Sequence, residues 1–413
     1  MEKVDKILSP QWIYFNNEKI SENYSIVISG NIIIDIIPTD EVKHNYQTDS
    51  YSSLRGQIMY SGLVHPHGCI CEYLSRSLSE NFSMDIAKLF ENRIINEEFV
   101  RLSTKISIIK LFKAGVSSFS DISIFPEEVL ETTNKLGMKV AFGLPILNQS
   151  NNWSKDENES YKKCLSTFDK YKSYPNIRMF FPIFVSSIAS ERMLSNISKI
   201  VNELEMPVRL INDTYLKGDK IAKILDRLDS LNLINDKFSC VNYSLDTKSF
   251  IKRITEQKIN IINSNITNED LRLMNKDLSL CVYIDDIKIN SDLNIVKKIE
   301  QNYFRKNIQI DEKKMLDMFI SKMNVNAAKA LNIYNSNGII EIGKDADLVS
   351  VSVNKLNILK DDVAKSILTK SGCCQNLWVS GKNVIKDGKL ITINENLLYD
   401  ELIEWKNKIK YEH

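Results

Sequence analysis

The sequence lacks several features that would assign it quickly to a class of protein. No uninterrupted apolar run approaches the roughly 18 residues that a membrane-spanning helix needs, and the N-terminal MEKVDKILSPQWIYF has no apolar stretch long enough for a signal peptide. Basic residues number 54 and acidic residues 53, so there is no surplus of one sign to favour nucleic acid. We therefore expect a cytoplasmic protein that binds neither membranes nor nucleic acids.

Histidine is scarce and unevenly distributed. The 413 residues include four histidines, His44, His65, His67 and His413, and none lies between residues 68 and 412. That long stretch therefore has no imidazole to offer to a metal ion. Cysteines number seven, an odd count in a chain without a secretion signal, which favours reduced thiols over disulfides.

The hydrophobic pattern changes twice along the chain. Residues 6–56 contain β-branched or aromatic runs separated by turns, which predicts short strands. Residues 57–338 alternate between strand-like runs and segments with helical apolar spacing. Strand-like runs return in ADLVSVSV and NLWVSGKNVIKDGKLITI, and a terminal helix is predicted over residues 397–410.

The middle segment contains eight strand-like runs, which is the number that closes a (β/α)8 barrel. In chain order they are GQIMYSGLVHPH, VSSFSDI, KVAFGLPI, IRMFFPI, PVRLI, FSCVN, NIINS and LSLCVYI. We therefore predict an α/β fold with a TIM barrel over residues 57–338. A small β-sandwich-like domain is predicted from both termini, residues 1–56 and residues 339–413, with the terminal helix at its end.

Four passages carry a resemblance to a known family. They are SGLVHPHGC at 61–69, GVSSFSD at 115–121 with FPE at 125–127, NSDLN at 290–294, and NAAKAL at 326–331 followed by GIIEIGKDADLV at 338–349. These passages resemble, in order and spacing, motifs of amidohydrolases in the methylthioadenosine/S-adenosylhomocysteine deaminase and triazine (ATZ/TRZ) hydrolase group. The likeness runs from about Ile7 to Trp405.

This resemblance implies an active site at the C-terminal ends of the barrel strands. There a zinc or iron ion would be held by two histidines of the first strand, one histidine each of the fifth and sixth strands, and an aspartate of the eighth. Such an ion lowers the pKa of a bound water from about 15.7 to about 7. A glutamate after the fifth strand would transfer the proton, and relatives are commonly homodimers.

Only some of the metal-ligand positions that the resemblance implies carry the expected residue. His67 matches the first histidine, Cys69 stands where the second is expected, and Asp285 matches the aspartate. Arg209 and Ile211 stand at the histidine positions of the fifth strand, where Ile211 has no donor atom. Catalytic zinc normally takes three protein ligands and a water. His67, Cys69 and Asp285 are three potential ligands, but the thiolate would leave the metal a weaker Lewis acid and the other histidine ligands are gone. We therefore expect these three positions to be without a metal.

The remaining candidate residues would serve substrate and proton transfer. Asn242 stands in place of the histidine of the sixth strand, and Asn263 in place of a further family histidine near substrate. Arg76 matches an arginine after the first-strand motif and either touches substrate or holds its loop. The predicted substrate-binding residues are therefore Arg76, Arg209, Asn242 and Asn263. Asp213 falls near the position of the acid/base glutamate.

Two alternatives at the site stay open. His65, His67, Cys69 and Cys71 alternate, so on a strand they would share one face and could form a new zinc site. We favour a strand that ends near His67, after which the later residues scatter. If Asp285 is buried and no cation is bound, its carboxylate needs hydrogen-bond donors, and Arg209 is a candidate partner for it.

Two functions follow from these residues. The missing ligands favour a protein that has lost metal-dependent hydrolysis, needs no cofactor, and acts as a non-catalytic binder of a small ligand or as a partner subunit. The alternative is a hydrolase or deaminase that acts on C–N bonds of a purine-like or other heterocyclic substrate with an atypical zinc or iron site. In that case Asp213 and Asp285 would be catalytic. Lys344 and Asp347 are expected to be structural.

Overall fold

The computed structural model describes residues 1–15, 19–68, 74, 95–216, 219–243, 248–264, 279–282, 318–353, 363, 367 and 374–412. Cys69, Cys71, Arg76 and Asp285 lie outside these described residues. The predictions that concern these four side chains therefore stay predictions.

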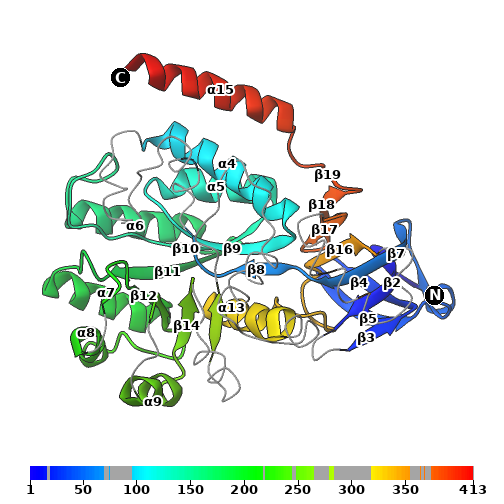
Figure 1. Ribbon diagram of the computed structural model, residues 1–413, viewed down its shortest axis with the longest axis horizontal. Helices are drawn as coiled ribbons and strands as arrows, with labels where there is room; N and C mark the ends of the chain where they lie inside the picture. Colours follow the sequence, from blue (N-terminus) through cyan, green and yellow to red (C-terminus); the bar gives the residue numbers. More distant parts are fainter. Residues whose placement is uncertain are drawn as a thin grey trace, which may run out of the picture.

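A curled sheet of eight parallel strands forms the centre of the molecule (Figure 1). The strands are β8 (Leu63–His65), β9 (Val116–Ile122), β10 (Lys139–Gly143), β11 (Ile177–Phe184), β12 (Val208–Ile211), β13 (Ser239–Val241), β14 (Asn260–Asn263) and β15 (Leu280–Val282). Each strand pairs with its neighbour in chain order. Every strand falls within one of the eight predicted runs except β11, which extends one residue past its run, because parallel strands buried on both faces are continuous apolar segments.

Helices connect the strands and lie on the outside of the curled sheet (Figure 1). They are α4 (Glu97–Lys113), α5 (Pro126–Leu136), α6 (Glu157–Tyr171), α7 (Glu191–Leu204), α8 (Asp219–Ser230) and α9 (Lys248–Glu256). Helix α5 begins at Pro126 and ends before Gly137, as the sequence predicts. Gly137 has a φ of 78°, a left-handed conformation that glycine adopts without a steric penalty.

A second sheet of nine strands combines the two ends of the chain. Its strands are β2 (Lys6–Tyr14), β3 (Ile20–Glu22), β4 (Tyr24–Ser29), β5 (Ile32–Pro38), β7 (Tyr51–Ser61), β16 (Leu348–Ser352), β17 (Asn376–Val379), β18 (Lys382–Lys386) and β19 (Lys389–Leu390). All pairings are antiparallel except that of β2 with β7. Beside it, β1 (Glu2–Lys3) pairs with β6 (Tyr46–Gln47), which follows α1 (Val42–Asn45). The β domain built from both termini is therefore present, while its domain limits stay predictions.

Two helical segments near the end of the chain pack on the parallel sheet and its helices. The π-helix η1 (Met318–Met323) leads into α13 (Asn324–Ala330), which contacts β8, β14 and β15. The terminal helix α15 (Glu395–Glu412) lies over α4, where Phe99 and Trp405 meet edge to face at 5.3 Å (Figure 1). In the described part of the chain, no helix is long and apolar enough to cross a membrane.

A buried polar cluster joins the parallel sheet to the terminal β domain. Lys139, the first residue of β10, lies 2.6 Å from Asp345 and 3.0 Å from Asp347. Asn337 donates to Asp347 at 2.7 Å and to Ser118 of β9 at 2.6 Å. We call Lys139, Asn337, Asp345 and Asp347 the junction cluster. These contacts agree with a structural role for Asp347.

Candidate functional site

The first site element is the segment that leaves β8. The strand ends at His65, and both His65 and His67 are buried, with exposed fractions of 3% and 4%. The strand therefore ends before His67, as the favoured interpretation expects. The alternative zinc site also needs Cys69 and Cys71, so it stays untested. Among the described residues, no group of three or more histidine, cysteine and acidic residues could hold a metal ion.

The environment of His67 disfavours its charged form. Burial lowers the pKa of this imidazole well below its ordinary value, and the positive charges of Arg209 and His65 lower it further. His67 is therefore neutral at pH 7. A neutral imidazole can accept one hydrogen bond and donate another.

Arg209 of β12 is buried, with 2% of its surface exposed. Its guanidinium carbon lies 4.1 Å from the centre of the Phe180 ring. Its hydrogen-bond acceptors are Ser120 Oγ at 2.7 Å, the Pro66 carbonyl at 3.0 Å, Ser239 Oγ at 3.1 Å and the Ala330 carbonyl at 3.3 Å. These contacts place the guanidinium among β8, β9, β12, β13 and the carboxyl end of α13, beside the segment that carries His67.

The charge on Arg209 persists at neutral pH despite burial. Burial lowers the pKa of the guanidinium to about 9, which still leaves it protonated at pH 7. Burying a charge is unfavourable unless hydrogen bonds compensate for the lost water. Four acceptors and the face of Phe180 supply that compensation. Arg209 is therefore a stable positive charge inside the curled sheet.

The neighbouring positions test whether the zinc or iron ion of the resembled family fits. Ile211 is two residues along β12 from Arg209, so it lies on the same face of the strand, and it is fully buried. Asn242 follows β13 with a φ of 60° and carries an amide in place of an imidazole. With a cation at 209, an alkyl group at 211 and an amide at 242, these described residues do not fit the metal.

The side-chain amide of Asn263 forms hydrogen bonds with the main chain of the protein. Its Oδ1 accepts from the Tyr243 main-chain nitrogen at 2.9 Å, and its Nδ2 donates to the Tyr243 carbonyl at 2.8 Å. These two bonds hold the end of β14 to the segment after β13. The main chain of Asn242 is held as well, because its main-chain carbonyl accepts from Asn212 Nδ2 at 3.0 Å. A role for Asn242, Asn263 and Arg209 in substrate binding stays a prediction.

Asp213 is two residues beyond the end of β12 and is partly exposed. Its carboxylate accepts from the Ser186 main-chain nitrogen at 2.9 Å and also from the Ser186 hydroxyl. Ser186 follows β11, so the carboxylate is held between the C-terminal ends of two adjacent strands. The sequence reasoning missed Ser186, Ser120, Ser239 and Asn212. The only signal for Ser186 is a hydroxyl residue three positions after the end of a predicted strand.

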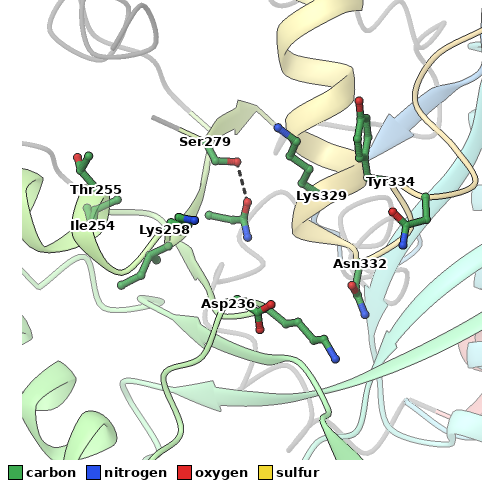
Figure 2. A pocket seen from close by; sticks show the side chains of 12 residues that line it. Asp236, Ile254, Thr255, Lys258, Ser279, Lys329, Asn332 and Tyr334 are labelled. Carbon is green, nitrogen blue, oxygen red and sulfur yellow. Dashed lines mark hydrogen bonds between the residues drawn. The ribbon is translucent and has the colours of Figure 1, made fainter. Parts of the chain in front are cut away.

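A cavity of about 450 Å³ lies at the opposite ends of the strands (Figure 2). Asn260, the first residue of β14, and Ser279, just before β15, both line it and are joined by a hydrogen bond of 2.6 Å. Lys258, Lys329 and Tyr334 also line it. TIM-barrel active sites lie at the C-terminal ends of the strands. This cavity is therefore separate from the predicted site.

Comparisons with known proteins agree with the family resemblance. Residues 211–384 match the model of the Amidohydrolase family. A 5-methylthioadenosine/S-adenosylhomocysteine deaminase of Saccharophagus degradans is 24% identical over 98% of this chain and 97% of its own length. A similar deaminase of Teredinibacter turnerae is 22% identical over 98% of both chains. A 5'-deoxyadenosine deaminase of Methanobrevibacter smithii is 22% identical over 91% of both.

Solved structures show the same fold. An adenosine deaminase from Xanthomonas campestris with bound zinc has a TM-score of 0.85, at 19% identity over 99% of both chains. An atrazine chlorohydrolase from Arthrobacter aurescens complexed with zinc has a TM-score of 0.72, at 12% identity over 97% of this chain and 99% of that chain. At these identities the likeness establishes the fold.

The comparisons contradict one prediction. The sequence reasoning favoured a non-catalytic ligand binder or partner subunit, but relatives that match nearly the whole chain are named deaminases. That prediction is wrong. The prediction rested on the loss of metal ligands alone. Loss of those ligands does not by itself show that a site has lost its catalytic activity.

Proposed function

We propose, on the premise that this chain carries an Amidohydrolase family domain, that it is a hydrolytic deaminase of an adenosine-type compound. The observation that carries this proposal is the match to deaminases over 98% of this chain and 97–98% of theirs. A shared fold alone does not specify a reaction. The match in both sequence and length to enzymes of one named activity is what favours this one.

We also propose that the parallel sheet closes into a TIM barrel. Helix α13 contacts β8 and β15, the first and last strands, and so brings the two edges of the sheet towards each other. Closure would gather the segment of His67, the interior charge of Arg209 and the loop of Asp213 around one opening. The sandwich-like form of the β domain, a homodimer and a cytoplasmic location stay predictions.

The proposed reaction adds water to the ring carbon that bears the amino group and releases ammonia. Water supplies the oxygen of the product. One of its protons goes to the leaving nitrogen and the other stays on the product, so the reaction needs no oxidant or reductant. A positioned acid or base that moves such a proton typically contributes about 10²–10⁴-fold in rate. Asp213 is our candidate, because Ser186 holds its carboxylate while part of it stays exposed.

The test is release of ammonia by the full-length protein. We expect ammonia and the matching inosine-type product from 5'-methylthioadenosine, S-adenosylhomocysteine or 5'-deoxyadenosine, with guanine as a comparison substrate. Asp213→Asn should lower kcat by about 10²-fold or more, because the amide cannot carry the proton. Asp236→Asn is the matched control, since Asp236 lines the cavity at the far ends of the strands.

Each result bears on a separate part of the proposal. Absence of ammonia from all of these compounds, in a protein that is folded, would contradict the deaminase assignment. Full activity of Asp213→Asn would leave the deaminase standing but refute the role of Asp213. Equal losses in Asp213→Asn and Asp236→Asn would indicate a general effect on folding and would also refute that role.

A further inference from the structure

Arg209 places a buried positive charge beside the segment of His67, which matches the first metal ligand of the resembled family. By the sequence match Arg209 stands at one of the two histidine positions of the fifth strand. Its Nη1 lies 3.0 Å from the carbonyl of Pro66, the residue directly before His67. A divalent ion bound to His67 would therefore stand close to a buried guanidinium, where repulsion is weakly screened.

We propose that the guanidinium of Arg209 replaces the divalent ion, so that the interior of this barrel carries a covalently fixed positive charge and folds without a metal. Arg209 is thus a positioning residue, which holds several strands of the sheet together in place of a metal. Its bonds to Pro66, Ser120 and Ser239 reach β9, β13 and the segment after β8.

The contacts of Arg209 suit a built-in cation. Its four acceptors are two hydroxyls and two main-chain carbonyls, all uncharged, and they are spread around the planar guanidinium. The Ala330 carbonyl ends α13, where the partial charge of a helix is negative. The Phe180 ring covers one face of the group. Lysine could not make this set of bonds, because its donors radiate from one atom.

The decisive measurement is the metal content of the full-length protein. We expect protein purified without chelator to hold far less than one divalent ion per chain by elemental analysis. Its melting temperature should be the same with a chelator, without it, and with added zinc. One tightly held zinc or iron per chain, whose removal lowers the melting temperature, would overturn the proposal.

Variants test whether the charge itself is required. Arg209→Met should lower the melting temperature clearly, and Arg209→Lys should recover only part of the loss. Arg253→Met is the matched control, because Arg253 makes ion pairs with the exposed Asp226 and Asp229 at the surface. Equal melting temperatures for Arg209→Met and Arg253→Met would overturn the proposal. If Arg209→Met does not fold, the metal content of the wild-type protein decides.

One arm of the experiment rests on the proposed deaminase function. If ammonia release is found, we expect the rate to survive treatment with a chelator. A rate that falls to background with the chelator and returns with zinc would overturn the role of Arg209 while leaving the deaminase intact. If no substrate is turned over, the deaminase proposal fails, and the metal content and melting temperatures still decide the inference about Arg209.

Discussion

At the scale of single residues, the four described cysteines are buried thiols: Cys164, Cys240, Cys281 and Cys374. Burial raises the pKa of each of them, for Cys281 to about 12. Because the thiolate is the reactive form, these thiols should not react in the folded protein at pH 8. We expect iodoacetamide treatment followed by peptide mass mapping to find all four unmodified.

The same mapping after unfolding in guanidinium chloride is the control, since all four peptides should then carry the label. Labelling of any of the four in the native protein would show that its burial is wrong. The prediction of reduced thiols from an odd cysteine count agrees with these four free thiols. Composition could indicate the redox state, but it could not indicate which thiols are buried, because burial depends on tertiary packing.

At the scale of elements, Asn324 joins α13 to the start of the parallel sheet. Its Oδ1 accepts from the Val64 main-chain nitrogen at 2.7 Å, and its Nδ2 donates to the Gly62 carbonyl at 3.1 Å and the Gly338 carbonyl at 3.2 Å. Asn324→Ala would remove this partner from the Val64 nitrogen and the Gly62 carbonyl, whereas the Gly338 carbonyl keeps its bond from the Ser61 hydroxyl. An unsatisfied buried polar group costs about 1–3 kcal/mol. We expect a loss of at least this size in the free energy of unfolding, measured with urea.

Asn202→Ala is the control for this variant, because Asn202 is exposed on α7 and bonds within that helix to the carbonyl and hydroxyl of Ser198. Its effect should stay within about 0.5 kcal/mol. If the two variants were equally stable, the link between α13 and β8 would contribute nothing measurable, and the argument that α13 helps to close the sheet would lose its support.

The elements also show what the sequence could predict. All eight parallel strands coincide with predicted runs to within one residue, and α5 begins and ends at its predicted proline and glycine, because apolar periodicity and cap residues are local signals. The contacts within the candidate site could be predicted less well from local patterns. Arg209 was singled out, but its acceptors at Pro66 and Ala330 are 143 and 121 residues away. No local pattern records such partners, so the hydrogen bonds that hold the charge could not be predicted.

At the scale of the whole molecule, the junction cluster ties the parallel sheet to the terminal β domain. Lys139 comes from β10, whereas Asp345 and Asp347 come from the segment that enters β16. The side chain of Lys139 is 8% exposed and that of Asp347 is 1% exposed, so the pair is shielded from solvent. Asp347 also accepts from the Ser380 main-chain nitrogen at 2.7 Å. Removing Lys139 would therefore leave buried negative charge at the junction of the two units.

We expect Lys139→Met to lower the free energy of unfolding by about 3–5 kcal/mol at pH 7, since one partner of a buried ion pair is lost. Lys170→Met, which breaks an exposed pair with Glu131, should cost no more than about 1 kcal/mol. Urea unfolding of both variants beside the wild-type protein measures the difference. Equal effects of the two substitutions would show that the junction cluster does not hold the units together.

The pH dependence of the same comparison tests the charge on Lys139. Burial lowers the pKa of Lys139, but the two carboxylates more than offset this and raise it above its ordinary value of 10.5. Its stabilising contribution is therefore complete below that ordinary value and is lost as the pH rises through the raised value of the folded state. The difference between the wild-type protein and Lys139→Met should be constant from neutral pH to mildly alkaline pH and shrink only beyond 10.5. A difference that already shrinks near neutral pH would mean that the lysine is not held as a cation by Asp345 and Asp347.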